Sequence, residues 1–245
     1  MNLLAPVLCG ASGLALGSFA VTAALRYGRN EGFALGRSRC DACGCALSFS
    51  QTVPILSYWG LRGACAGCGA RIDAIHLIGE LGGAAILASA LAASSGDPLR
   101  WALLSALGLC LMASAAVDAR SLRLPNALTL VIAACGAGLS LEHGTEALLT
   151  GLAYAACASV LLQALRWIAG RGGRDPGLGF GDVKLVAALG LWLGPLTPVM
   201  VAAAASIALL WALGLRRARG SIAFGPHIAI AAWAIGLTSE AFAWL

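Results

Sequence analysis

Two aspartates stand at borders between polar loops and long apolar segments. Asp118 follows the apolar segment 101–117, and Asp182 precedes another apolar segment. A carboxylate close to a bilayer is energetically costly, so it usually serves a function. If the two meet at one membrane depth, they can hold one proton between them, so that one activates a water and the other protonates the leaving amine. The pair predicts peptide-bond hydrolysis with Asp118 and Asp182 as catalytic residues, although Asp118 alone could equally be an interfacial charge paired with Arg120 or Arg123.

The sequence around Asp182 combines two glycines, one acid and one base. It reads GFGDVKL from Gly179 to Leu185, where a glycine-rich irregular stretch becomes strongly apolar. We take Gly179, Gly181 and Lys184 as the residues that support Asp182 in this motif.

Four of the nine cysteines form two C-x2-C pairs. Cys40 and Cys43 are separated from Cys65 and Cys68 by 21 residues, and a glycine follows each pair. Four thiolates at this spacing suit tetrahedral zinc, and a closed shell of four cysteines gives the metal a structural role. Cys45 is a spare thiol that could compete with Cys43, but the symmetry of the two pairs favours Cys43.

The composition is that of an integral membrane protein. The chain has 245 residues, of which 60% are hydrophobic and 11% are charged, and its mean hydropathy is +0.86. The net charge of +5 does not indicate nucleic-acid binding, because the basic residues sit in short clusters between apolar segments rather than on one continuous face.

The apolar segments predict eight membrane-spanning helices with both chain ends outside. Every Lys and Arg except Arg100 then lies on the cytosolic side. Asn126 is expected to cap the helix that it precedes. The predicted segments are 1–25, 75–95, 101–117, 126–141, 147–165, two helices within 183–215, and 223–244.

The segment 185–215 is uncharged and must hold two helices that turn at Gly194 and Pro195. Since one crossing needs about 20 residues, the helix 183–193 must be short. Gly13 and Gly17, at GxxxG spacing, predict close helix packing. Glu80, inside the second helix, is expected to be a structural hydrogen-bonding residue.

These features predict an all-α polytopic membrane protein with a small cytosolic zinc-ribbon-like insertion between its first two spanning helices. Residues 1–26 are the first helix. Residues 27–74 form the cytosolic four-cysteine zinc-binding domain. Residues 75–245 form a seven-helix membrane core that carries the aspartate pair.

Several motifs resemble one family. The GFGDVKL motif resembles the GxGD signature of the type IV prepilin peptidases, membrane aspartic proteases of bacteria. Similar matches are GLALGSFAVTAALR from Gly13, SRCDACG from Ser38, VPILSYWGLRGACAGCGARI from Val53, DARSLRLPNALTL from Asp118 and FGPHIAIA from Phe224.

The resemblance implies cleavage of the short basic leader of type IV prepilins and pseudopilins, at the cytosolic face of the bacterial inner membrane. Asp118 and Asp182 match the family's two catalytic aspartates. Larger members also N-methylate the new terminus from S-adenosylmethionine, and the four cysteines that accompany this second activity are kept here. The resemblance therefore leaves methylation open, and it names no oligomeric state.

A proton- or metal-coupled membrane transporter with a zinc-sensing loop is the alternative. A transporter predicts acidic residues deep in several spans. Here the two aspartates sit at one face and the centres of the spans are nearly free of charge, so the peptidase is favoured.

Overall fold

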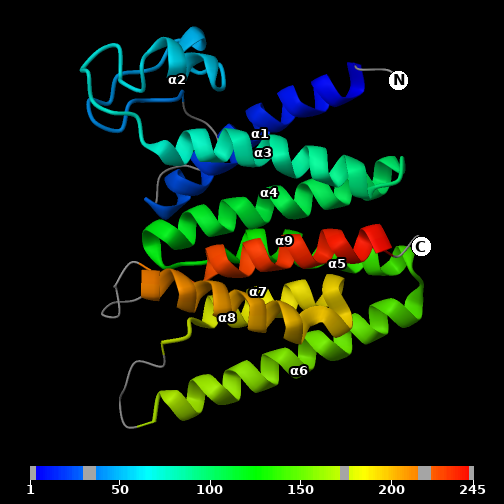
Figure 1. Ribbon diagram of the computed structural model, residues 1–245. Coiled ribbons are helices and arrows are strands. Elements are labelled where there is room, and N and C mark those ends of the chain that lie inside the picture. Colours follow the sequence, from blue (N-terminus) through cyan, green and yellow to red (C-terminus); the bar gives the residue numbers. More distant parts are fainter. Residues whose placement is uncertain (1–3, 30–36, 172–176, 215–221, 243–245) are drawn as a thin grey trace. The chain divides into compact units, whose positions relative to one another are not determined.

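The structure, a computed structural model, describes residues 4–29, 37–171, 177–214 and 222–242 and is built mainly of helices (Figure 1). Within these residues, eight helices of 14 residues or more correspond one to one to the eight predicted segments. The outermost residues of three predicted segments, at 1–3, 215 and 243–244, lie outside the described residues. The long helices are α1 (Leu4–Gly28), α3 (Ala74–Ala93), α4 (Pro98–Ser121), α5 (Asn126–Glu142), α6 (Thr145–Ala169), α7 (Phe180–Leu193), α8 (Thr197–Gly214) and α9 (Gly225–Phe242).

Five helical segments are long and apolar enough to cross a membrane, judged by length and composition among the described residues. One of them, Phe180–Gly214, is interrupted by the 3-10 turn η2 (Gly194–Leu196), so it contains two helices, as predicted. The shorter α5 is also apolar. The five segments are Pro6–Gly28, Ala74–Ala93, Pro98–Ser121, Thr145–Ala169 and Phe180–Gly214.

The chain divides into two compact units, Met1–Ser89 and Ala90–Leu245. In the first unit, α1 packs on α3 through glycines of both helices. A Cβ at Gly83 would lie 2.6 Å from the Cα of Gly17, so only glycine permits this approach. The close packing predicted for Gly13 and Gly17 is therefore confirmed, and its partner is a second GxxxG pair, Gly79 and Gly83.

The chain between α1 and α3 carries the cysteines. It also contains the short helices η1 (Phe49–Gln51) and α2 (Leu56–Gly60). Its only extended pairings among the described residues are two isolated antiparallel bridges, Arg39 with Ala46 and Ala64 with Arg71. Each bridge encloses one C-x2-C pair, so the insertion is built as two similar loops.

In the second unit, α7 packs against α5, α6 and α9. Leu185 and Leu189 of α7 are fully buried in the core. Glycines allow the close approaches: a Cβ at Gly190 would lie 2.9 Å from the Cα of Ala155 on α6, and one at Gly136 on α5 would lie 3.1 Å from the Cβ of Trp192. At 14 residues, α7 is about 21 Å long, which is shorter than a hydrocarbon core of about 30 Å.

An ionic network with a buried centre, Arg100 and Glu240, and an exposed edge, Glu142 and His143, occupies the start of α4, the end that lies away from Asp118. Arg100 is 3% exposed, and its Nε donates to Glu142 Oε2 at 2.8 Å. Its Nη1 lies 3.5 Å from Oε2 of the buried Glu240, and the Trp192 Nε1–H donates to Glu240 Oε1 at 3.0 Å. His143 Nε2 completes the group at 3.7 Å from Glu240 Oε2. The network joins α4, α5, α7 and α9.

Candidate functional site

Asp118 lies in the last turn of α4 and is 5% exposed. Its Oδ2 accepts a hydrogen bond from the backbone N–H of Gly225, the first residue of α9, at 2.8 Å. The first N–H groups of a helix have no partner inside the helix, so α9 offers this donor at no cost to its own structure. A Cβ at residue 225 would lie 2.8 Å from Asp118 Oδ2, so the approach requires glycine.

Asp182 lies in the first turn of α7 and is 8% exposed. Its Oδ2 accepts from the N–H of Gly179 at 3.1 Å, and a Cβ at Gly179 would lie 3.0 Å from that oxygen. A Cβ at Gly181 would lie 3.0 Å from the Cβ of Leu124, the residue before the Pro125 that precedes α5. Both motif glycines therefore permit close contacts at the start of α7.

The two carboxyl groups are brought together by three helix ends. The end of α4, the start of α7 and the start of α9 lie at the same end of the second unit, on the left in Figure 1. Asp118 and Asp182 are close enough to interact electrostatically, although they are distant in sequence. Among the described residues, each of the two carboxylates accepts its hydrogen bond from a backbone N–H through Oδ2.

Lys184 ties α7 to α5. Its Nζ donates to Asn126 Oδ1 at 3.1 Å and lies 4.6 Å from the centre of the Phe180 ring. The prediction that Asn126 caps α5 is wrong: α5 begins at Asn126, and Pro125 holds the capping position. Since Asn126 is the first helical residue and not the cap, its Oδ1 accepts from Lys184 instead of from the N–H groups of α5.

The Sγ atoms of Cys40, Cys43, Cys65 and Cys68 all lie within 4.8 Å of one another. Four sulfurs tetrahedral about zinc at about 2.3 Å would be about 3.8 Å apart, and Cys40 Sγ lies 3.9 Å from Cys68 Sγ. Backbone N–H groups of Cys43 and Ala42 lower the pKa of the Cys40 thiol to about 7, whereas the neighbouring cysteines, Cys43 first, raise the pKa of Cys68 to about 12. These opposite shifts show that the four sulfur atoms crowd one small space. The four side chains could bind a metal such as zinc.

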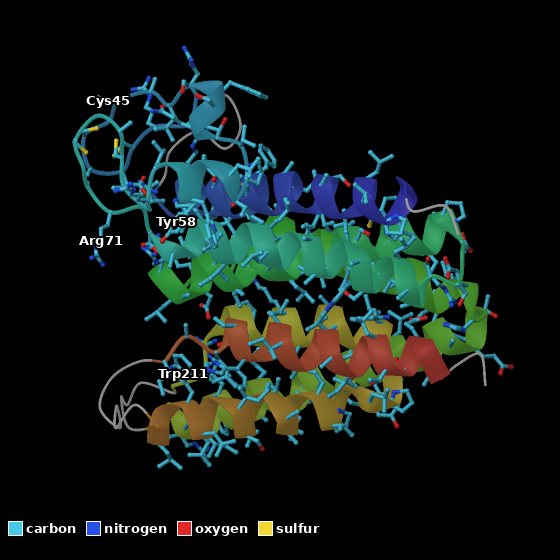
Figure 2. All side chains as sticks on the ribbon, turned by 45° about the horizontal axis from the view of Figure 1, so that its top comes forward. Cys45, Tyr58, Arg71 and Trp211 are labelled. Carbon is cyan, nitrogen blue, oxygen red and sulfur yellow. The ribbon has the colours of Figure 1, made fainter. Side chains whose placement is uncertain are left out.

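The two cysteine loops share one backbone design. The N–H of Gly44 donates to the carbonyl of Cys40, and the N–H of Gly69 donates to that of Cys65. Both glycines have positive φ, +70° and +71°, so each loop turns at the glycine after its cysteine pair. The exposed Cys45 does not belong to the group of four (sulfur atoms in yellow near Cys45 in Figure 2).

Comparison with known proteins identifies two regions of similarity. Residues 11–94 match the bacterial peptidase A24 N-terminal domain, and residues 103–213 match the type IV leader peptidase family. A "type 4 prepilin-like proteins leader peptide-processing enzyme" of Escherichia coli O78:H11 is 32% identical over 254 residues, which cover 92% of this chain and 91% of that protein. The chain belongs to the type IV leader peptidase family.

Other relatives of this family carry the name "prepilin leader peptidase/N-methyltransferase". The protein of Burkholderia pseudomallei (strain 1026b) is 38% identical over 79% of this chain, which spans 64% of that relative's length. The protein of Dichelobacter nodosus is 34% identical over 80% of this chain and 69% of its own length. No solved structure is significantly similar to the chain.

The sequence patterns assign no role to Gly225 and His227, two residues of the aspartate site, although both lie in the FGPHIAIA motif. Gly225 donates to Asp118, and the buried His227, two residues later, interacts electrostatically with Asp118. The sequence feature that could have identified His227 is its position in an apolar segment, because an ionisable residue in a membrane segment suggests a function.

Glu80 makes the hydrogen bonds predicted for it. Its Oε1 accepts from Ser18 Oγ at 3.1 Å and its Oε2 accepts from the N–H of Ile55 at 2.7 Å. Glu80 is buried, and through these two bonds it links α1, α3 and the cysteine-bearing insertion within the first unit.

Proposed function

We propose that the protein is a membrane aspartic endopeptidase that removes the basic leader of type IV prepilins and pseudopilins, with Asp118 and Asp182 as its catalytic residues. The proposal rests on one observation above all: two buried carboxyl groups from different helices interact at one end of the second unit. The names of relatives in the leader peptidase family support the substrate class.

In the proposed reaction, one carboxylate removes a proton from a water whose oxygen attacks the scissile carbonyl carbon. The other, protonated carboxyl group gives its proton to the leaving amine nitrogen as the carbon–nitrogen bond breaks. The backbone donors Gly225 and Gly179 each hold Oδ2 of one aspartate, and we assign the proton transfer to Oδ1. The products are the leader with a new carboxyl end and the mature chain with a new amine.

The proposal includes the location of the site and the division of the chain. The active site faces the cytosol of the bacterial inner membrane, because nearly all Lys and Arg then lie inside. Residues 1–26 form the first spanning helix, 27–74 the cytosolic metal domain and 75–245 the core with the aspartate pair. Zinc bound by the four cysteines serves as a structural staple, for which their mutual spacing and closed shell are the support.

A second activity, methylation of the new N-terminus from S-adenosylmethionine, is favoured by one observation. Relatives named for both activities align with 79% and 80% of this chain, and the complete set of four cysteines is assembled here. Mass measurement of the cleaved product tests it, since one added methyl group is expected when S-adenosylmethionine is supplied.

The decisive test compares wild type, Asp118→Asn and Asp182→Asn in detergent with a purified prepilin. We expect leader removal by the wild type and loss of cleavage in both variants with metal content unchanged. Asp97→Asn is the matched control: Asp97 caps α4 through its side chain, asparagine caps a helix equally well, and normal cleavage is expected. Normal processing by either Asp118→Asn or Asp182→Asn would refute the assignment.

A further inference from the structure

His227 is a buried ionisable side chain that the proposed reaction does not use. It lies in the first turn of α9, two residues after Gly225, and is 8% exposed. A buried imidazole requires a hydrogen-bond partner, since leaving it unpaired costs free energy. Its partner indicates its role.

That partner is the chain that enters α9. Nδ1 of His227 lies 3.0 Å from the carbonyl oxygen of Ala223. A carbonyl oxygen can only accept, so Nδ1 carries the proton and donates. This bond spans the turn that contains Phe224 and Gly225. It therefore helps to orient the Phe224 carbonyl and the Gly225 N–H.

The same turn presents the donor to Asp118. The Phe224 carbonyl accepts from the N–H groups of His227 at 3.0 Å and Ile228 at 3.1 Å, so it starts the hydrogen bonding of α9. The N–H of Gly225 is thereby left outside the helix ladder and points to Asp118 Oδ2. The direction of this N–H depends on the turn that His227 closes.

Aromatic neighbours fix the orientation of the imidazole. The Phe224 ring stacks on His227 with centroids 6.5 Å apart and an interplanar angle of 25°. Trp211 of α8, labelled in Figure 2, meets the ring edge-on at 6.4 Å. Both contacts favour the ring orientation in which Nδ1 meets Ala223, and the position of the ring also lets it interact electrostatically with Asp118.

We infer that His227 is a positioning residue for Asp118: through its bond to Ala223 it orients the Gly225 N–H that holds Asp118 Oδ2. The inference rests on the proposed function, because it concerns how the same aspartate is held. In this proposal His227 acts on Asp118 through the backbone turn, which makes it a positioning residue and not a catalytic one.

The test uses the full-length protein in detergent, a prepilin substrate and two substitutions. His227→Phe keeps the ring stacking but removes the donor, and His227→Asn places an amide N–H near the position of Nδ1. We expect His227→Phe to lower kcat about 10- to 100-fold, the range for loss of one hydrogen bond to a charged group, with KM within about twofold of wild type. His227→Asn is expected to recover kcat to within about threefold of wild type, because the bond is restored.

Ser206→Ala is the matched control, since Ser206 Oγ makes the same kind of bond to the carbonyl four residues earlier, that of Ala202 within α8. We expect it to keep wild-type kcat. Melting temperature and elution as a single species show that each variant is folded. A His227→Phe variant with wild-type kcat, a His227→Asn variant as slow as His227→Phe, or a loss of kcat that only follows loss of folded protein would each overturn the inference. If wild type does not cleave at all, the proposed function itself fails, which is a distinct result.

Discussion

Removing Arg100 tests whether the charges at the start of α4 form a single network around the buried pair Arg100 and Glu240. In Arg100→Leu, the carboxylates of Glu142 and Glu240 would remain with their main counter-charge removed. Breaking a buried ion pair by deleting one partner costs about 3–5 kcal/mol. For a chain of this size, each kcal/mol shifts the melting temperature by about 2–4 °C, so the melting temperature should fall by about 6–20 °C.

The assay is thermal unfolding in detergent followed by tryptophan fluorescence. Arg123→Leu is the matched control, because Arg123 is exposed and such substitutions change stability by about 0.5 kcal/mol or less. The triple variant Arg100→Leu, Glu142→Gln, Glu240→Gln should recover part of the loss, since neutral amides need no counter-charge. A melting temperature of Arg100→Leu within about 2 °C of wild type would refute the network as a source of stability.

Two further substitutions test the first unit. Cys65→Ser should lower zinc affinity at least about 100-fold, because a ligand is lost. Cys45→Ser is the control and should leave the metal content, measured by elemental analysis, unchanged. Equal metal loss in both variants would contradict the assignment of the four ligands. Gly83→Ala should destabilise the protein by about 1–3 kcal/mol, because its Cβ would meet the Gly17 backbone. Gly10→Ala is the control, because it adds a methyl group where nothing lies within 4 Å and should cause no such loss. Similar melting temperatures for these two glycine variants would show that α1 and α3 do not pack through this crossing.

The helices and the cysteine loops could be predicted from the sequence because both depend on local patterns. Apolar segments bounded by charged residues predict helices. Because the chain turns at Gly194 and Pro195, only a short helix fits between Asp182 and this turn, as α7 shows. The C-x2-C-G pattern likewise contains its own turn, since the positive φ at Gly44 and Gly69 favours glycine.

Contacts between distant helices could not be predicted in this way. The sequence identifies Arg100 only as the one basic residue outside the cytosolic set, and nothing in it pairs that residue with Glu240 near the end of α9. Gly225 meets Asp118 across 107 residues for the same reason. Such pairs depend on which helices pack side by side, and in a uniformly apolar chain the sequence pattern carries little information about neighbours.

The arrangement of the two aspartates follows from how a membrane protein can supply hydrogen-bond donors. Inside a helix every N–H is already bonded, and the hydrocarbon offers no water, so free backbone donors occur only at helix starts. Asp182 takes such a donor at the start of α7, through Gly179, and Asp118 takes one at the start of α9, through Gly225. An aspartate pair held by backbone N–H groups must therefore lie where helices begin, and the glycines at these two positions are needed because a Cβ would fill the space that the carboxylate oxygen occupies.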